Sequence, residues 1–433
     1  MPVRAFRDRI RHMSDRAREK VLAPLDARMA DLEALYEDLH RHPELSFQET
    51  RTAAEVARRL KADGFDVHTG IGRTGVVGVL RNGDGPTVLL RADMDALPVT
   101  EQSGLPYAST NEGVMHACGH DIHVTCLIGA AGLLAAGRDH WSGTLIALFQ
   151  PAEEDGGGAQ KMIDDGLYSK VPVPDVVYAQ HVAPLGAGLI AYHDGACMAA
   201  ADSLRITFHG TGGHGSRPET TVDPIVMAAS FVQRVQSVVA RETASREQAV
   251  VTVGSFHAGD APNVIPDHAT VQLSIRTFDE EVRARVLAAV DRIARAEAAA
   301  SGAARAPETE TIAGFPVTRN DSEALREVNA AFAGLFGEQA LFPYDPASGS
   351  EDAGLLATAA NAPLYYWWLG GWDPAAFRKA MEAGRISQDI PSNHSARFAP
   401  VQQPTLTMGT RALVAAALTR LGKDGQTGAG AGD

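Results

Sequence analysis

Short apolar segments that alternate with helical ones constrain the fold of this 433-residue chain more than any other feature. Gly75–Leu80, Thr87–Ala92, Gly143–Gln150 and Val176–Gln180 are near-continuous apolar runs, and Thr125–Ala136 between them has the length of a helix. Strands of that kind are buried on both faces, as in sheets covered by helices on each side. The first part of the chain therefore predicts an α/β domain.

The apolar pattern changes near Ala199. Ser203–His209 alternates apolar and polar residues, as an antiparallel strand with one exposed face does. The elements expected after it are a helix, two strands and a second helix, at Asp223–Ala240, Ala249–Phe256, Ala269–Thr277 and Glu280–Ala300. The order β-α-β-β-α predicts a ferredoxin-like α+β domain over residues 199–311, with an Ala- and Gly-rich exit linker at Ala298–Ala306.

Beyond this inserted domain, the pattern of alternating helices and buried strands resumes. The expected elements are Ser322–Phe336, Glu351–Ala360, Leu364–Leu369 and Thr405–Leu421. We therefore expect one α/β domain, built from residues 28–198 and 312–422, with the smaller domain inserted in it. Residues 1–27 are expected to form a charged helical extension, and the low-complexity residues 423–433 a disordered tail.

Composition and charge exclude several classes of protein. Lys plus Arg number 39 against 53 Asp plus Glu, a formal charge of −14, which argues against a nucleic-acid partner or an anionic membrane surface. The first 25 residues lack the apolar stretch of a secretory signal, and no apolar window is long enough to span a bilayer. Three cysteines are too few for a disulfide framework. We expect a soluble, cytoplasmic protein.

Histidines and acids are concentrated in a few segments, of which MHACGHDIH at Met115–His123 is the densest. Cys118 and His120 supply a thiolate and an imidazole two residues apart, and both are good ligands for zinc or a similar divalent ion. A lone cysteine or histidine is more often a buried thiol or a capping residue. The three histidines, the cysteine and the aspartate gathered here favour a metal site.

Two adjacent glutamates follow the apolar strand that ends at Gln150, in the sequence QPAEED. One of Glu153 and Glu154 can bind a metal while the other accepts a proton from bound water. Such a pair on its own is usually a solvated surface feature. Its position after a buried strand and before three glycines favours a functional role.

Four further side chains lie at the ends of predicted strands or beside the last helix. His181 ends a strand and His394 precedes the last helix, although each alone is more often a surface or capping residue. Asp93 and Asp95, in RADMDALP, lie on one face of an extended segment, where either can orient a histidine ligand. The alternative is that they are simply two acids at the start of a turn.

Five motifs together resemble those of a known family. RADMDALP, MHACGHDIH, PAEE, GSED at Gly349–Asp352 and NHS at Asn393–Ser395 resemble the M20 metallopeptidases, in this order and spacing. The resemblance is to their amidohydrolase branch, which includes hippurate hydrolase, N-acyl-amino-acid amidohydrolases and auxin-conjugate hydrolases, and it runs from about Arg28 to Leu421. It implies a two-domain protein whose mixed-sheet α/β domain binds metal and whose inserted α+β lid dimerises.

The resemblance also implies roles for individual residues. Two divalent ions, zinc by preference and otherwise manganese, cobalt or nickel, would be held by Cys118, His120, Glu154, His181 and His394. Glu153 matches the general base, which takes a proton from water and passes it to the leaving nitrogen. A metal-bound Cys118 is a thiolate ligand rather than a nucleophile.

The inserted domain carries a part of the resemblance as well. GTGGHGSRP at Gly210–Pro218 matches the lid loop, in which His214 would reach across a homodimer to stabilise an oxyanion or a carboxylate. Asn263 and Arg276 match positions that grip the α-carboxylate of a small N-acyl amino acid, and the fork of an arginine suits that task. Without the resemblance, His214 is an ordinary turn histidine and Arg276 an arginine on the face of a strand.

Several alternatives stay open. The same site could serve a metallo-dipeptidase or aminopeptidase, and a protein of another class would be a non-catalytic, metal-stabilised binding protein. Glu153 argues against a binding protein, because such a protein needs no general base beside the metal-binding residue Glu154. The aromatic segment Tyr365–Pro374, YYWWLGGWDP, is either the wall of an acyl pocket or a core strand with a turn.

Overall fold

The computed structural model describes residues 16–423 of the chain. These residues form two compact units, one of 16–195, 319–345 and 352–423, and the other of 196–318 and 346–351. Most of the expected 1–27 extension, residues 1–15, lies outside the described residues, and so does the expected disordered tail except Lys423. No helix in the described part of the chain is both long and apolar enough to cross a membrane.

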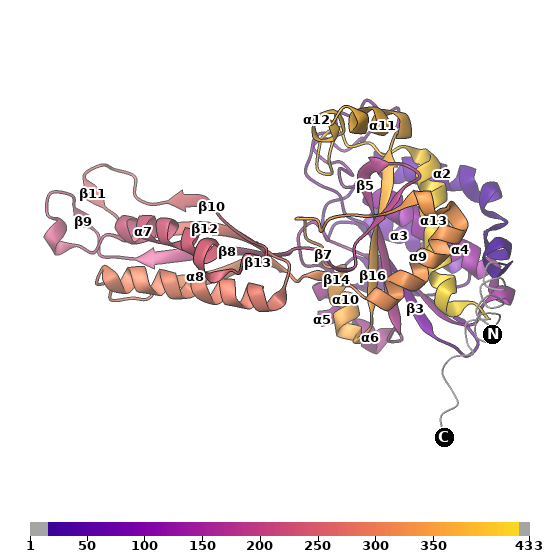
Figure 1. Cartoon of the computed structure of the whole chain (residues 1–433), viewed down its shortest axis with the longest axis horizontal. Helices are drawn as coiled ribbons and strands as arrows, with labels where there is room; N and C mark the ends of the chain where they lie inside the picture. Colours follow the sequence, from indigo (N-terminus) through magenta and orange to yellow (C-terminus); the bar gives the residue numbers. More distant parts are fainter. Residues whose placement is uncertain (1–15, 424–433) are drawn as a thin grey trace, which may run out of the picture. The chain divides into compact units, whose positions relative to one another are not determined.

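The described part of the first unit is built on a mixed sheet of eight strands (Figure 1). The strands are β1 (Asp66–Ile71), β2 (Gly75–Asn82), β3 (Thr87–Asp93), β4 (Gly143–Gln150), β5 (Val176–Gly186), β6 (Ile190–Tyr192), β15 (Leu341–Pro343) and β16 (Leu364–Trp372). Their order is β1-β2-β4-β3-β5-β16-β6-β15. Strands β4, β3, β5 and β16 run parallel, so their carboxyl ends meet at one edge of the sheet.

Helices cover this sheet because its central strands are buried on both faces. The helices are α2 (Leu25–Arg41), α3 (Thr50–Ala62), α4 (His120–Ala136), α5 (Gly158–Asp164), α6 (Leu167–Lys170), α9 (Ser322–Phe336), α10 (Ala353–Ala360), α11 (Pro374–Glu382), α12 (Ile386–Asp389) and α13 (Gln402–Leu421). Helices α4 and α13 pack on each other and on β3 and β5, with α2 and α9 beside them, whereas α10 packs on α5 and β5 (Figure 1). Residues 120–134 of α4 are all buried, as in a helix enclosed by protein.

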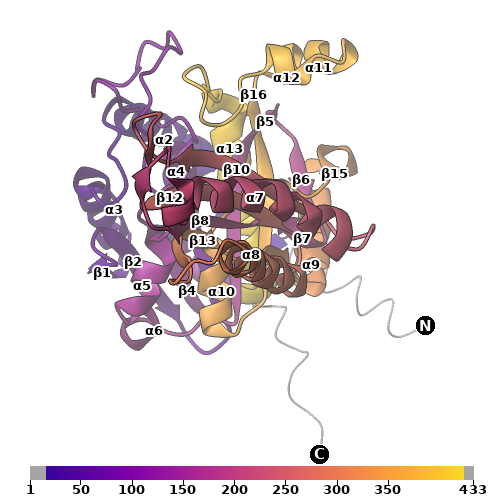
Figure 2. The same cartoon turned by 90° about the vertical axis from the view of Figure 1, so that its left-hand side faces the viewer.

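The second unit is an antiparallel sheet with helices on one face (Figure 2). Its main elements are β8 (Ala200–His209), α7 (Pro224–Ser237), β10 (Ala249–His257), β12 (His268–Thr277), α8 (Glu280–Ala300) and β13 (Glu308–Phe315). The strand order is β10-β12-β8-β13. Alternate residues of β12 are buried, and its inner face forms a separate core with residues such as Phe208 and Phe231.

The structure differs from the sequence-based expectations at several element boundaries. Helix α4 begins at His120 instead of Thr125, and β5 continues through His181 to Gly186. Helix α8 covers Glu280–Ala300 as expected, and residues 301–307 connect it to β13, a fourth strand of the inserted sheet that the sequence did not predict. Residues 16–22 are helical, and Val21 is buried in the core of the first unit rather than in a separate extension.

The aromatic segment of β16 belongs mainly to the core. Tyr365, Tyr366 and Trp367 are buried, whereas Trp368 is only partly buried and its ring lies 5.5 Å from that of His181. Most of this segment is therefore a core strand, the second of the two hypotheses for it.

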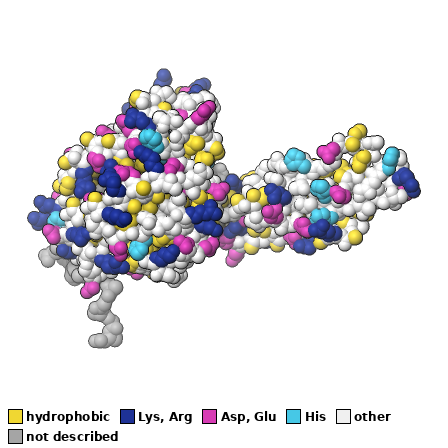
Figure 3. Space-filling model, turned by 180° about the vertical axis from the view of Figure 1, so that it is seen from behind, with side chains coloured by type: hydrophobic (Ala, Val, Ile, Leu, Met, Phe, Trp, Pro, Cys, Tyr) yellow, Lys and Arg dark blue, Asp and Glu magenta, His cyan; other side chains and the backbone are white. Residues whose placement is uncertain are grey.

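The surface carries charges of both signs. On the face shown in Figure 3, basic and acidic side chains are interspersed.

Candidate metal centre and catalytic site

The candidate site lies at the carboxyl ends of the parallel strands β3, β4 and β5. Asp93 ends β3, Glu153 and Glu154 follow the end of β4, and His181 lies within β5. The first turn of α4 brings His120 to the same edge. Open α/β sheets place their functional groups at this edge, because the loops that follow neighbouring parallel strands meet there.

Three of the side chains predicted from the sequence form one cluster. Ligand atoms of Cys118, His120 and Glu154 all lie within 4.8 Å of one another. The Sγ atom of Cys118 is 3.5 Å from Nε2 of His181, and Nε2 of His394 is 3.2 Å from Oε1 of Glu154. The structure therefore brings together all five side chains that the resemblance assigns to the metals.

The hydrogen bonds of His120 and His181 leave one ring nitrogen of each facing the cluster. Nδ1 of His120 lies 3.2 Å from a carboxylate oxygen of Asp95, and Nδ1 of His181 lies 2.8 Å from the carbonyl oxygen of Val182. Both acceptors place the proton on Nδ1, so the Nε2 lone pairs point into the cluster. Among the described residues, Nε2 of His120 is buried without a hydrogen-bond partner, which is the condition of a nitrogen placed to bind a metal.

The electrostatics of the cluster favour a cation. Burial opposes a charge on His120, but Asp93 and Cys118 outweigh it and raise the pKa of His120 well above its usual value. The negative charges that attract a proton to this ring also attract a metal ion. At His181, burial and the neighbouring His123 ring hold the pKa well below the usual value, so this imidazole is neutral and can act as a ligand.

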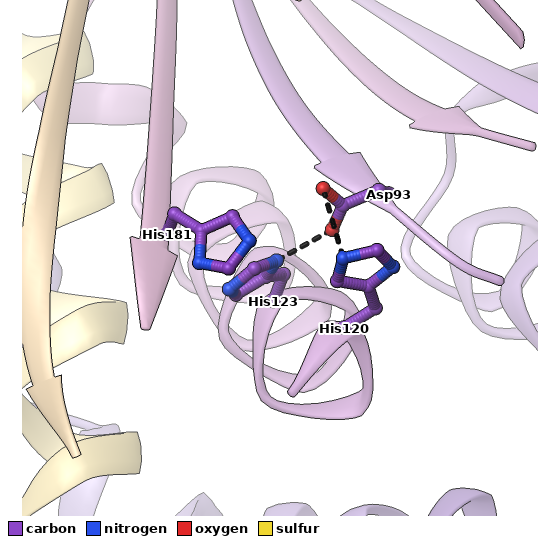
Figure 4. Close-up of side chains that lie close together, drawn as sticks. All are labelled: Asp93, His120, His123 and His181. Carbon is purple, nitrogen blue, oxygen red and sulfur yellow. Dashed lines mark hydrogen bonds and ion pairs between the residues drawn. The ribbon is translucent and has the colours of Figure 1, made fainter. Parts of the chain in front are cut away.

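His123 approaches the cluster but uses both ring nitrogens elsewhere (Figure 4). Its Nδ1 lies 2.5 Å from Oδ1 of Asp93, and its Nε2 accepts a 2.8 Å hydrogen bond from the backbone N–H of Val182. A nitrogen that accepts an N–H has no lone pair left for a metal. His123 therefore orients Asp93 and the strand that carries His181, a role that the sequence did not reveal.

Asp93 lies in a buried charged network. Its Oδ2 accepts a 2.6 Å bond from the guanidinium of Arg91, which also donates to Gln150 and to Asp352. Burial raises the pKa of Asp93, but Arg91 and the nearby imidazoles hold it well below its usual range. With one oxygen bonded to Arg91 and the other to His123, Asp93 supports the ligands and stays charged. Arg91 was not predicted, although a lone arginine in an apolar strand is a recognisable signal of a buried ion pair.

Asp95 connects the histidine of α4 to the two adjacent glutamates. Besides His120, it accepts hydrogen bonds from the backbone N–H groups of Glu153 and Glu154, at 3.1 and 3.0 Å, and from the hydroxyl of Ser46. Glu153 itself is buried. One carboxylate thus sets the orientation of a ligand ring and of the turn that carries the candidate base.

The loop that carries His394 is fastened to Cys118 by Asn393. The side-chain amide of Asn393 donates to the carbonyl oxygens of Cys118 and Val182, both at 3.2 Å, and lies 3.7 Å from the Cys118 sulfur. The backbone N–H of His394 donates to Ala117. Asn393 was part of a motif in the sequence but had no predicted role.

The second unit holds the other three predicted residues. His214 is exposed on β9 (Gly213–His214), which pairs with β11 (Val264–Ile265), so Asn263 lies beside it. Arg276 is near the far end of β12 and donates to Ser350. The extended strand from His268 to Arg276 spans roughly 25 Å, so the second unit does not bring Arg276 next to His214 and Asn263.

Comparisons with known proteins show which family the chain is similar to. A model of peptidase family M20/M25/M40 matches residues 89–382. Hippurate hydrolase of Campylobacter jejuni is 43% identical over 75% of this chain and 85% of its own. N-acetylcysteine deacetylase of Bacillus subtilis is 37% identical over 80% of this chain and 91% of its own.

A solved structure to which this chain is similar is named as a member of the same family. It is a dinuclear metal-binding peptidase of the M20 family from Bacillus subtilis, 31% identical, and the alignment covers 91% of this chain and 98% of that one with a TM-score of 0.74. The mixed sheet, the cluster of candidate ligands and these relatives lead to one conclusion. The chain belongs to peptidase family M20/M25/M40 and is a hydrolase of amide bonds.

Proposed function

We propose that the protein is a dinuclear metal-dependent amidohydrolase that removes the acyl group from N-acyl amino acids or related small conjugates. The observation that carries the proposal is the pair of inward-facing Nε2 atoms, on His120 and His181, beside the Cys118 thiol and next to the Glu153–Glu154 turn. Thiolate, imidazole and carboxylate donors together suit zinc, and also manganese, cobalt or nickel.

The metal ligands in this proposal are Cys118, His120, Glu154, His181 and His394. Bound divalent ions supply a water of lowered pKa and polarise the amide carbonyl. Glu153 accepts the proton of that water and delivers it to the leaving nitrogen, which is otherwise a poor leaving group. Cys118 acts as a ligand.

The names of the relatives favour N-acyl amino acids as substrates, because two of them are named for hippurate hydrolysis and N-acetylcysteine deacetylation. A metallo-dipeptidase is the second candidate, favoured by the solved neighbour that is named a peptidase. Turnover of N-acetyl, N-benzoyl, long-chain N-acyl and dipeptide substrates with each metal separates the two. Hydrolysis of dipeptides alone would overturn the first candidate.

Metal content and one substitution test the mechanism. We expect about two divalent ions per chain, and Glu153→Gln should keep them and the fold while losing nearly all turnover. Glu338→Gln, the same change at an exposed glutamate of the first unit, is the control for the substitution itself. Normal turnover of Glu153→Gln, or full activity of metal-free protein, would contradict the proposal. A metal-stabilised binding protein would show metal and ligand binding without turnover in the unsubstituted chain.

We also propose a homodimer formed through the second unit. Strand β10 is an edge of its sheet, and Val250 and Phe256 on it are exposed, which is unusual for an edge strand left in water. In this dimer, His214 and Asn263 of one copy serve the site of the other. Mixing inactive His214→Ala and Glu153→Gln proteins should then restore activity, because a hybrid dimer contains one intact site. No recovery after proven subunit exchange would exclude shared sites.

A further inference from the structure

The turn that carries Glu153 and Glu154 has a backbone conformation that its residues do not favour. Ala152 has φ of +48°, in the left-handed region that non-glycine residues rarely adopt. The chain folds back tightly here, since the N–H of Gly158 donates to Ala152 and a Cβ atom at position 158 would lie 1.6 Å from the carbonyl oxygen of Pro151. A conformation of this kind persists only when its surroundings impose it.

Two carboxylates impose it through three consecutive backbone N–H groups. Asp95 accepts those of Glu153 and Glu154. The N–H of Ala152 itself donates to Oε1 of Glu49, at 2.8 Å. The left-handed residue is therefore held by Glu49, a residue 103 positions earlier in the sequence.

Glu49 is in turn fixed within the first unit. It is fully buried, and its Oε1 also accepts the N–H of Phe47 at 2.9 Å, while its Oε2 accepts the hydroxyl of Thr74 at 2.5 Å. Burial raises the pKa of Glu49, which these hydrogen bonds oppose. A buried carboxylate is costly unless its partners compensate for it, and here every partner is a group that shapes a local turn. Phe47, like Ala152, has positive φ.

We infer that Glu49 is a positioning residue that holds Ala152 in the left-handed conformation and thereby fixes the direction of the Glu153 carboxylate. This inference rests on the proposed role of Glu153 as base. Glu49 touches neither substrate nor metal in this scheme. Its loss therefore changes how often Glu153 is correctly placed and leaves the five ligands intact, because Asp95 still holds Glu154.

The test compares Glu49→Leu with Glu49→Gln and with a control on the same segment. Leucine removes the acceptor of the Ala152 N–H, whereas glutamine keeps an oxygen for it and can donate to Thr74. We expect Glu49→Leu to lower kcat roughly 10- to 100-fold, with KM and metal content unchanged, and Glu49→Gln to recover most of the loss. If the leucine variant is insoluble, Glu49→Asp replaces it. Its shorter side chain cannot reach Ala152, so it should also lower kcat and leave KM and metal content unchanged.

Glu44→Leu is the matched control. Glu44 accepts the N–H groups of Arg51 and Thr52 at the start of α3, so its loss removes a similar set of bonds without touching the 151–154 turn. It should lower stability and leave kcat unchanged. If Glu49→Leu and Glu49→Asp also lower stability and leave kcat unchanged, or if they lose metal, Glu49 is a structural residue and the inference fails.

Two double variants separate this inference from the proposed function. Ala152→Gly added to Glu49→Leu should restore part of kcat, because glycine adopts positive φ freely. Glu49→Leu added to Glu153→Gln should cause no further loss if Glu49 acts through Glu153. Additive losses, or no rescue by Ala152→Gly, would overturn the role of Glu49, whereas an active Glu153→Gln would instead overturn the role of the base.

Discussion

At the scale of single residues, the peptide groups of Val182 link two histidines of the site. Its N–H donates to Nε2 of His123 and its carbonyl oxygen accepts from Nδ1 of His181. These two bonds determine the tautomer of both rings, and so decide which histidine can bind a metal and which cannot. Two histidines at the same edge of the sheet thus have different functions.

This difference predicts different metal losses for two alanine substitutions. His181→Ala removes a ligand and should reduce the metal content at saturation. His123→Ala should keep the full metal content but weaken metal affinity by about 10- to 100-fold, as loss of a residue that supports a ligand does. Competition with a chromogenic chelator measures both. Equal loss of stoichiometry in the two variants would show that His123 is a ligand.

His40 forms a second buried polar network beside the site. Its Nδ1 is 2.6 Å from Asp121 and its Nε2 is 3.2 Å from Glu101. Burial lowers the pKa of His40, but the two carboxylates outweigh burial and raise it to about 9. An imidazolium between two carboxylates therefore connects α2, the start of α4 and the loop that contains Glu101.

The raised pKa predicts a pH-dependent stability. Because the pKa of about 9 in the folded protein is above the usual value of 6.5, the contribution of His40 is complete below pH 6.5 and is lost as pH rises through 9. The free energy of unfolding of the native protein, relative to His40→Gln, should fall by about 3 kcal/mol over this range. Urea unfolding at pH 6 and pH 9.5 measures it. A difference that does not change with pH would contradict a charged His40.

At the scale of elements, the start of α4 shows what a sequence pattern can and cannot predict. The apolar run Thr125–Ala136 predicted a helix, but the helix begins at His120, after Gly119 with φ of +81°. Buried polar residues hide the first turn, because His120, Asp121 and His123 break the apolar pattern although they face the protein interior. The functional residues themselves are thus the reason for the error.

The elements that carry the site could be predicted, but the residues that orient it could not. Strands, the inserted position of the second unit and the clustered ligands follow from apolar patterns and local motifs. The bonds from Arg91 to Asp352 and from Glu49 to Ala152 join positions far apart in the sequence, and no local pattern says which two residues pair. Such pairs become visible only when the sheet brings their segments together.

The surroundings of two helical glycines, Gly409 on α13 and Gly132 on α4, predict opposite effects of substitution by alanine. A Cβ atom at Gly409 would lie 2.6 Å from the buried Cys126 sulfur and 2.7 Å from Leu369, so Gly409→Ala should destabilise the protein by about 1–3 kcal/mol. At Gly132 the obstacles are the ends of the Arg28 and Asp63 side chains, which can turn aside, and Gly132→Ala should be neutral or gain up to about 1 kcal/mol of helix propensity. Denaturant midpoints compare them, and equal destabilisation would contradict this account.

At the scale of the whole molecule, two units with separate cores share one chain. All five proposed metal ligands belong to the first unit, and so do all four tryptophans: Trp141, Trp367, Trp368 and Trp372. Tryptophan fluorescence therefore reports on the first unit alone, whereas far-UV circular dichroism reports on the helices of both.

Metal removal should consequently destabilise one unit selectively. Metal at about 1,000 times its Kd stabilises the unit that binds it by about 4 kcal/mol. A chelator should lower the midpoint of the unfolding transition seen by fluorescence. It should leave unchanged a second unfolding transition seen by circular dichroism, which is that of the inserted unit. Phe231→Ala, in the inserted core, should move only this second transition. A chelator that shifts both transitions equally would show that the units unfold together.

The strand order has a consequence for how the protein is made. Strands β5 and β6 are neighbours in the sequence, but β16 lies between them in the sheet, and His394 comes later still. A ribosome must therefore synthesise the whole inserted unit before the central sheet can be completed. The inserted unit has all its strands and helices by then and can fold first. Metal capture by the complete set of ligands is accordingly among the last steps of maturation, and the ion loads a fold that is already assembled.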